Sequence, residues 1–274
     1  MKVIYHKSCA DGFCAAFVLS KIQKYKGAQF ISYQYGESAS PLFGCDESIS
    51  IVDDDVLIAD FSFDRETMLK IADQSRSVKC YDHHRTAEKE LEGLSFCHFD
   101  MSKSGARLVY ENEYLPAGKS LGYDGLIKFL VDYTEDRDLW RWELPHSRAI
   151  SAAIASYPFD FELWGGFYDG TLKSEGRAIL RYQKNIIDRA VLNARNIELN
   201  GAKGMLVGAS MLQSEIGEVL SEKSDFAAMV FIVDDGVVFS LRSKGDFDVS
   251  ELAKTYNGGG HKNAAGFKLS FYDA

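Results

Sequence analysis

The sequence predicts an α/β fold in which a doubly wound, parallel-sheet N-terminal domain is joined by a long helix to a smaller mixed α/β domain. In the first part of the chain, strand-like runs alternate with helix-like segments, which is the pattern of βαβ units. A long segment with an apolar period of about 3.6 follows, and short strand-like runs return after it. We therefore expect a first domain over residues 1–195, a connector helix over about 172–199 and a second domain over 200–274.

The first domain opens with apolar runs short enough to be strands, separated by helical or polar segments. The expected strands are Met1–Tyr5, Gln29–Tyr33, Asp55–Ala59 and Ser77–Tyr81. The expected helices are Gly12–Lys26, Arg65–Gln74, Ser104–Glu113, Tyr123–Tyr133 and Arg148–Ala155. Pro116 and Pro145 interrupt the helical pattern between the later ones.

The second domain follows the connector helix, whose apolar positions include Ile179, Ile186 and Val191. Its expected elements are the strands Gly204–Ala209, Phe226–Val233, Val237–Leu241 and Gly266–Ser270, with a short helix near Val249–Tyr256. Strands of both short and moderate length around one helix predict a small mixed sheet.

The composition, 46% hydrophobic and 26% charged, is that of a globular protein with an ample core. The net charge of −9 argues against a protein that grips long duplex nucleic acid, because that binding depends on Lys and Arg displacing counterions. A short anionic substrate held by metal ions and a few basic groups is compatible with an acidic chain.

The cysteines are odd in number and form no CxxC pair, which argues against a disulfide framework or a structural zinc site. They are Cys9, Cys14, Cys45, Cys80 and Cys97. No signal-type start precedes Lys2, and no apolar run reaches the length of a membrane span. We expect a cytoplasmic protein that does not bind membranes.

Histidine and aspartate stand at the ends of three predicted strands. His6 and Asp11 follow the first, Asp60 follows the third, and Asp82-His83-His84 ends the fourth. The carboxyl ends of parallel strands lie along one edge of a sheet, where ligands bind. Mixed carboxylate and imidazole donors at one place indicate a divalent metal site.

Each of these segments also has a structural interpretation. Asp11 could cap the helix after it, and on its own segment that interpretation is the more common one. Asp64 is explained as such a cap, whereas Asp60 lies directly at a strand exit and is not. The two adjacent histidines point in different directions, so one can bind metal while the other faces a substrate, and Asp82 can orient an imidazole.

Two later segments complete the pattern. Glu135-Asp136-Arg137-Asp138 offers three carboxylates among which spacing does not choose, and taken alone it is an ordinary helix end with solvated charge. Gly258-Gly259-Gly260-His261 can bring backbone amides close to a phosphate, and Arg242 ends the preceding strand run. A glycine turn before the last strand is the plainer interpretation of the glycine run.

Taken in order, these segments resemble the DHH phosphoesterase superfamily, specifically its RecJ-like and oligoribonuclease-like branch with a C-terminal DHHA1 domain. The resemblance spans almost the whole chain. His6 to Asp11 is similar to the first motif, Asp60 to the second, Asp82-His83-His84 to the third, Asp136 to the fourth and Gly258–Phe267 to the DHHA1 signature.

The resemblance implies a metal-dependent phosphoesterase with Mn²⁺, as one or two ions, or with Mg²⁺. It implies an active site between the two domains, with Asp60 bridging the ions. The implied metal ligands are His6, Asp11, Asp60, His83 and Asp136. His84 would face the scissile phosphate and Asp82 would support the histidines. The residues implied to hold the rest of the substrate are Arg242, Gly259, Gly260 and His261.

One position departs from the family pattern. The first motif usually supplies two aspartates, and Cys9 stands where the earlier one belongs. Thiolate is a softer ligand than carboxylate and suits Mn²⁺ less well. The sequence leaves open whether that metal position is lost, shifted or differently selective.

Acidity and modest length favour small nucleotides, such as short single-stranded oligoribonucleotides or linear dinucleotides, over long DNA. Alternatives are an exopolyphosphatase-like or cyclic-nucleotide phosphodiesterase activity. A non-catalytic nucleotide-binding protein with a degraded metal site is a further alternative. The sequence does not determine the oligomeric state, and a homodimer is compatible with it.

Overall fold

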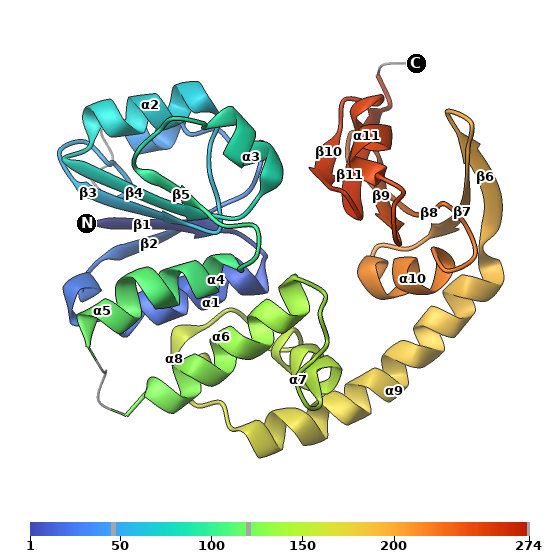
Figure 1. Cartoon of the computed structure of the whole chain (residues 1–274), viewed down its shortest axis with the longest axis horizontal. Coiled ribbons are helices and arrows are strands. Elements are labelled where there is room, and N and C mark those ends of the chain that lie inside the picture. Colours follow the sequence, from blue (N-terminus) through green and yellow to red (C-terminus); the bar gives the residue numbers. More distant parts are fainter. Residues whose placement is uncertain (45–47, 119–121, 273–274) are drawn as a thin grey trace. The chain divides into compact units, whose positions relative to one another are not determined.

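The computed structural model describes residues 1–44, 48–118 and 122–272. The chain forms two compact units, Met1–Ile179 and Leu180–Ala274. Figure 1 shows that the first contains a sheet between helices and the second contains a separate sheet. The division falls inside helix α9 (Asp169–Asn193), upstream of the domain boundary at 195–200 that the sequence suggests.

The first unit is built on a parallel sheet with the strand order β2-β1-β3-β4-β5. Its strands are β1 (Lys2–His6), β2 (Gln29–Tyr33), β3 (Asp55–Ala59), β4 (Ser77–Asp82) and β5 (Cys97–Phe99). The four strands expected from the sequence are present. The short β5 was not expected, because three residues carry too little periodicity to be recognised.

Helices cover both faces of this sheet, which confirms the doubly wound architecture. Val3 and Leu57 point to the face packed against α1 (Ala10–Ser20), α4 (Gly105–Val109) and α6 (Asp124–Asp138). The next residues along the strands, Ile4 and Ile58, point to the opposite face. Helix α2 (Arg65–Gln74) covers that face, and α3 (Arg85–Glu90) lies on the same side of the sheet.

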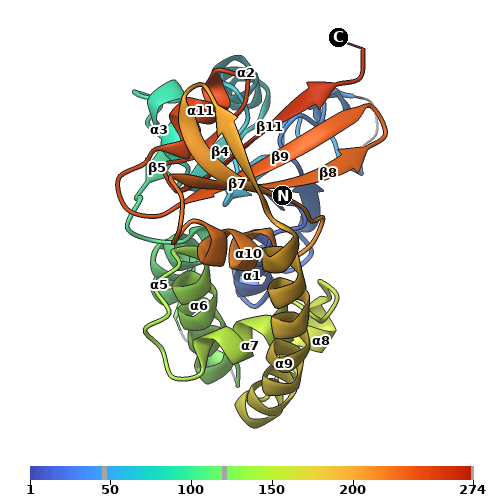
Figure 2. The same ribbon diagram turned by 90° about the vertical axis from the view of Figure 1, so that its right-hand side faces the viewer.

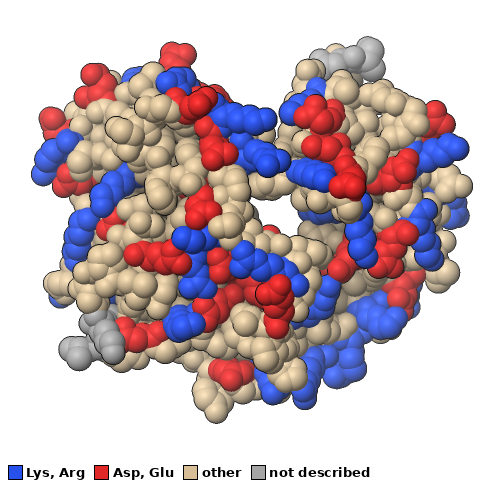
Figure 3. Space-filling view, in the orientation of Figure 1, with Lys and Arg blue, Asp and Glu red and all other residues tan. Residues whose placement is uncertain are grey.

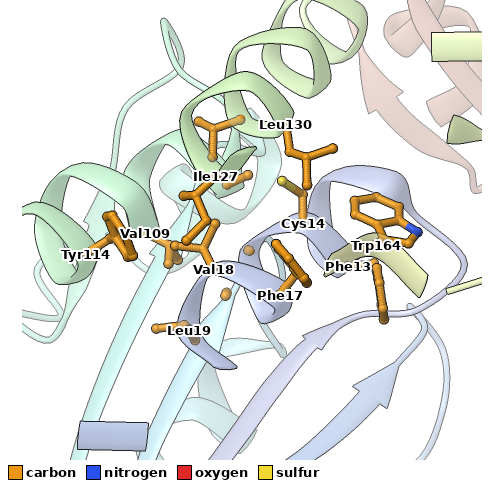
Figure 4. Packing of buried hydrophobic residues seen from close by; sticks show 14 of the residues in the cluster. Phe13, Cys14, Phe17, Val18, Leu19, Val109, Tyr114, Ile127, Leu130 and Trp164 are labelled. Carbon is orange, nitrogen blue, oxygen red and sulfur yellow. The ribbon is translucent and has the colours of Figure 1, made fainter. Parts of the chain in front are cut away.

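Around the larger of the two cores, aromatic side chains fill the space between α1 and the helices beside it. Phe13 and Phe17 from α1 pack near the fully buried Trp164 of α8 (Phe161–Gly165), as Figure 4 shows. The remaining helical segments of this unit are the π-helical turn Tyr110–Tyr114, α5 (Leu115–Ala117), α7 (Ser147–Ile154) and the 3₁₀ turns Gln23–Tyr25 and Ser40–Phe43.

Two predicted helices end earlier than expected. The first predicted helix stops at Ser20 rather than Lys26, and Tyr25 turns inward so that its hydroxyl contacts Glu113. The connector helix stops at Asn193, because Arg195–Leu199 pairs with the next strand as β6. Interactions distant in sequence therefore override the local helical pattern at both places.

The second unit contains a six-stranded sheet in the order β10-β11-β9-β8-β7-β6. The sheet is mixed, as the sequence predicts. Only β7 and β8 run parallel to each other. The elements after β6 are β7 (Ala202–Gly208), α10 (Gln213–Leu220), β8 (Phe226–Val233), β9 (Gly236–Ser243), α11 (Val249–Lys254), β10 (Gly259–His261) and β11 (Ala264–Ser270).

The two helices of this sheet lie on opposite faces. Phe226 and Ala228 pack with residues of α11, whereas Ala227 and Met229 pack with residues of α10. Figure 2 shows α10 beneath the strands and α11 beyond them. Strand alternation thus produces one small core on each side of the sheet.

The four cysteines within the described residues, Cys9, Cys14, Cys80 and Cys97, are free thiols, and Cys45 lies outside the described residues. Over the described part of the chain, no helix combines the length and apolar character needed to cross a membrane.

Candidate metal centre

The site residues of the first unit are brought together by strand register. Tyr5 pairs with Ala59, and Ala59 pairs with Tyr81, so these three residues form one row across β1, β3 and β4. The next residue of each strand lies at the same carboxyl edge. These residues are His6, Asp60 and Asp82.

His83 lies at the centre of a group of carboxylates. Its Nε2 atom is 3.1 Å from Asp60 Oδ1, 3.5 Å from Asp138 Oδ2 and 3.7 Å from Asp11 Oδ2. Three acidic groups from three different elements therefore face one imidazole nitrogen. A fourth acidic residue nearby, Asp82, does not face this nitrogen and accepts hydrogen bonds from the His83 backbone and the His84 ring instead.

Asp60 is an almost fully buried member of the group. Its side chain is only 1% exposed, with Oδ2 3.4 Å from His6 Nδ1 and Oδ1 facing His83. Within the described residues, neither oxygen accepts a hydrogen bond, and His6 Nδ1 also lacks one. Asp60 adopts a left-handed backbone conformation with φ of 55°, which is unusual for a residue other than glycine and places its side chain at the strand exit.

Asp11 does not cap its own helix. Its two carboxylate oxygens accept hydrogen bonds from the backbone N–H groups of Gly105, at 2.6 Å, and Ala106, at 3.0 Å. The N-terminus of α4, which Ser104 caps, therefore holds Asp11 in place. An anionic carboxylate is stabilised at that helix end.

Gly105 also contacts Asp60. A Cβ atom at Gly105 would lie 2.4 Å from Asp60 Cβ, which is too close for any side chain. The sequence predicts a helix over Ser104–Glu113 but no role for that helix at the site. The available signal was an N-cap serine followed by two small residues, Gly105 and Ala106.

Asp82 is fully buried and orients both histidines. Its Oδ1 accepts hydrogen bonds from the His83 backbone N–H at 2.7 Å and from His84 Nδ1 at 2.6 Å. Its Oδ2 accepts the hydroxyl of Ser62 at 2.8 Å. Because the His84 ring is held through Nδ1, its Nε2 atom lies on the side of the ring away from Asp82.

Tyr35, which the sequence did not single out, borders the same group. Its ring meets His6 and His84 edge-on, with centroids 5.3 Å and 5.6 Å apart, and contacts Phe61 at 4.8 Å. The residue is nonetheless 46% exposed. It therefore offers an aromatic surface beside the two imidazoles.

The structure distinguishes the two aspartates of the acidic segment. Asp138, at the end of α6, lies beside His83 and keeps 26% of its side chain exposed. Asp136 lies elsewhere, because its carboxylate accepts backbone N–H groups of Glu143 at 2.9 Å and Leu144 at 3.4 Å. The sequence predicts Asp136 as the metal ligand, whereas the positions of the two side chains favour Asp138.

The electrostatics of the group follow from its crowded charges. Burial raises the pKa of Asp11, and the carboxylates of Asp60 and Asp138 raise it further. Burial disfavours the charged forms of Asp60 and His83, but their mutual contact outweighs it. The pKa of Asp60 lies well below its usual value, because His6 and His83 stabilise the carboxylate. The pKa of His83 is raised to about 10 by Asp60 and Asp138.

Three sets of donor atoms lie within 4.8 Å of one another and could each hold a metal ion. They are His6, Cys9 and Asp60; Asp60, His83 and His84; and Asp11, His83 and Asp138. Asp60 and His83 are shared between sets. The partly buried Cys9 thiol has a pKa well above its usual value, first because of desolvation and then because of the nearby carboxylates of Asp60, Asp138 and Asp11.

In the glycine segment of the second unit, Gly259–His261 form strand β10 and Gly258 directly precedes it. Gly258 and Gly260 are required by backbone packing, since a Cβ atom would lie 2.2 Å from Gly266 O and 2.6 Å from Ala264 O, respectively. At Gly259, a Cβ atom would meet none of the described atoms within 4 Å. Gly259 is thus the glycine of β10 at which a ligand could approach the backbone.

His261 and Arg242 lie in the same sheet as this segment. His261 ends β10 opposite Ala264, and Arg242 pairs with Ala264 from β9. Arg242 donates from Nη2 to Ser214 Oγ at 3.0 Å and from Nη1 to Ser240 Oγ at 3.1 Å. These contacts fix its guanidinium within the unit.

Comparisons with known proteins agree with this organisation. Residues 206–273 match the DHHA1 domain family. The chain is 28% identical over 293 residues to an uncharacterized protein, R106, of Acanthamoeba polyphaga mimivirus, with 98% of this chain and 67% of that protein covered.

Two solved structures share the fold. An exopolyphosphatase-related protein from Bacteroides fragilis has a TM-score of 0.58 at 15% identity, with 98% of this chain and 86% of that chain covered. RecJ from Thermus thermophilus, in complex with Mn²⁺, has a TM-score of 0.57 at 14% identity, with 98% and 49% covered. The chain therefore spans about half the length of that RecJ chain.

The chain thus combines two parts. The first is a parallel α/β unit with imidazoles and carboxylates at its carboxyl edge, and the second matches the DHHA1 domain family. The comparisons show a DHHA1 match over residues 206–273 and a fold shared with the exopolyphosphatase-related protein and RecJ, and both findings agree with the resemblance to the DHH phosphoesterase superfamily.

Proposed function

We propose that the protein is a divalent-metal-dependent phosphoesterase that hydrolyses phosphoester bonds of small nucleotides, such as short oligoribonucleotides and linear dinucleotides. The observation that carries the proposal is Asp60. It is a buried carboxylate without hydrogen bonds from the described residues, placed between His6 and His83. A buried carboxylate needs a compensating positive charge, which protonated His83 supplies here and which a divalent cation would supply in its place.

The donor chemistry fits such a cation. Carboxylates and imidazoles together suit Mn²⁺ and related ions, and carboxylates with water suit Mg²⁺. We assign His6, Asp11, Asp60, His83 and Asp138 as ligands, with Asp60 shared because its oxygens face different imidazoles. Divalent cations bound there would activate a water molecule near neutral pH and withdraw charge from phosphoryl oxygens.

The surrounding residues have separate tasks. Asp11 is fixed by the α4 amides, so its position does not depend on the substrate. Burial disfavours protonation of His84, but Asp82 raises the pKa of the ring above its usual value. His84 would therefore present a proton on Nε2 to a phosphoryl or leaving-group oxygen. Gly259, Gly260, His261 and Arg242 of the DHHA1 domain stay proposed substrate-binding residues.

The proposed substrate is small because the chain is acidic and its charges are mixed. On the face shown in Figure 3, acidic and basic side chains are interspersed over the first unit. The net charge of −9 does not suit the counterion displacement on which binding of long duplexes depends. The RecJ relative was solved with Mn²⁺, which supports trying that ion first.

The test is a substrate panel with metal-stripped protein and added Mn²⁺ or Mg²⁺. It compares a linear dinucleotide, short RNA, a cyclic dinucleotide and polyphosphate, the last because of the fold shared with the exopolyphosphatase-related protein. We expect the first two to be hydrolysed fastest and a chelator to abolish turnover. Asp60→Asn should reduce turnover at least about a hundredfold.

Asp64→Asn is the matched control, because Asp64 caps α2 through Thr67 away from the donor groups. Turnover that survives Asp60→Asn would contradict the metal mechanism. Tight nucleotide binding with no turnover of any substrate would instead favour a non-catalytic nucleotide-binding protein.

A further inference from the structure

The donor sets of the candidate metal centre differ in chemical softness. His6, Cys9 and Asp60 offer nitrogen, sulfur and oxygen, whereas Asp11, His83 and Asp138 offer two oxygens and one nitrogen. The first set therefore suits a different type of ion from the second. The thiol of the first set belongs to Cys9, the residue at which the sequence departs from the family pattern.

The local backbone directs Cys9 toward this set. Ser8 adopts a left-handed conformation with φ of 56°, which turns the chain sharply after β1. Gly12 then lies against the start of the turn, where a Cβ atom would be 2.5 Å from His6 O. The turn is closed by this glycine, and it brings Cys9 back beside His6.

Cys9 is at the N-cap position of α1, yet its side chain makes no capping hydrogen bond. The backbone carbonyl of Cys9 accepts the N–H of Phe13 at 3.0 Å instead. Capping therefore does not explain why a cysteine stands at this position, where serine, threonine or aspartate would cap better.

A second observation points independently to a ligand in the same place. The Asp60 side chain is 1% exposed, and both of its oxygens lack hydrogen bonds from the described residues. His6 Nδ1 is buried and unsatisfied as well, 3.4 Å from Asp60 Oδ2. Two unsatisfied polar groups thus lie in the same donor set as the Cys9 sulfur.

We propose that Cys9 is a thiolate metal ligand, and that the His6–Cys9–Asp60 set holds a borderline cation such as Zn²⁺, Co²⁺ or Fe²⁺. This inference rests on the proposed metal-dependent function and specifies one of its two positions. The Asp11–His83–Asp138 set, with no sulfur, keeps the preference for Mn²⁺ or Mg²⁺. The protein would therefore hold two unlike ions, one in each set.

Anaerobic titration of the full-length, metal-stripped protein with Co²⁺ tests this. As the Co–S bond forms, the thiol proton leaves to the solvent, and thiolate ligation gives a near-ultraviolet charge-transfer band. Nitrogen and oxygen donors alone do not give that band. We expect the band in the wild type and its loss in both Cys9→Ser and Cys9→Asp.

Cys97→Ser is the matched control, because Cys97 is a partly exposed thiol in β5 outside the three donor sets. It should keep the band. Cys9→Asp should also shift the ratio of Zn²⁺ to Mn²⁺ affinity toward Mn²⁺ by at least about tenfold, measured by competition. Circular dichroism of each variant shows whether it is folded, and Cys9→Asp supplies the test if Cys9→Ser does not fold.

The outcomes separate this inference from the proposed function. Binding of Co²⁺ and Mn²⁺ to the wild type without a Cys9-dependent band would overturn the thiolate ligand and leave the phosphoesterase proposal in place. A band that persists in Cys9→Ser would also overturn the thiolate ligand and leave the phosphoesterase proposal in place. Absence of any divalent binding would overturn both.

Discussion

The backbone of Gly105 lies against the side chain of Asp60, so closely that a Cβ atom at Gly105 would stand 2.4 Å from Asp60 Cβ and 2.8 Å from its Oδ1. The same residue donates its backbone N–H to Asp11. One glycine at the start of α4 therefore fixes two carboxylates that follow different strands of the sheet.

Gly105→Ala should destabilise the protein by about 1–3 kcal/mol, because the buried contact leaves no room for a methyl group. It should also weaken Mn²⁺ binding by displacing Asp60. Urea denaturation and a metal titration measure the two effects. Gly125→Ala is the control, because an added Cβ there meets none of the described atoms within 4 Å in helix α6. That control should stabilise by about 0.4–1 kcal/mol.

Asp136 and Asp138 should respond to substitution in opposite ways. Asp138→Asn removes a carboxylate from beside Asp11 and Asp60, so it should weaken Mn²⁺ binding at least about tenfold while raising the stability of the metal-free protein. Asp136→Ala removes the acceptor for two backbone N–H groups, so it should cost about 1–3 kcal/mol of stability and leave metal affinity nearly unchanged. Equal loss of Mn²⁺ affinity in both variants would contradict the placement of Asp138.

Metal binding should raise the melting temperature. The carboxylates of the site repel one another, and a cation that binds only the folded state stabilises it by about 2.7 kcal/mol at a hundredfold excess over Kd. Differential scanning calorimetry with Mn²⁺, and again after addition of a chelator, measures the shift. Asp60→Asn should abolish the shift, whereas Asp64→Asn should keep it. An unchanged melting temperature in the wild type at saturating Mn²⁺ would argue against a site in this group.

A separate buried network makes stability depend on pH. Glu113 accepts hydrogen bonds from Tyr25 at 2.5 Å, Tyr81 at 2.7 Å and Lys79 at 2.7 Å. Burial opposes ionisation of Glu113, but Lys79 and the two hydroxyl groups lower its pKa to about 2. The unfolded value is about 4.3. Because the folded pKa is the lower one, the stabilisation is present above pH of about 4.3 and is lost as the pH falls toward 2.

We therefore expect the melting temperature to fall more steeply with acidification in the wild type than in Glu113→Gln, which has no carboxyl group to titrate there. Thermal denaturation between about pH 6 and pH 3 measures both slopes. Glu92→Gln, at an exposed position, should follow the wild type. Parallel curves for wild type and Glu113→Gln would show that this network does not contribute.

The amino-acid order alone predicts the α/β class, the four longer strands of the first sheet and the His and Asp residues at their ends. Strand periodicity is local, and parallel strands share a carboxyl edge, so the order of residues alone was enough to expect His6, Asp60 and His83 together. It also identified Cys9 as an unusual residue in the first motif.

Packing between elements distant in the sequence determines which other side chains complete the site. Asp136 and Asp138 are two residues apart on α6, and since successive helical residues turn by about 100°, they point in nearly opposite directions. Only the packing of α6 against the sheet brings Asp138 to His83. The roles of Gly105 and Tyr35 likewise depend on contacts between elements distant in sequence, which no local pattern of residues encodes.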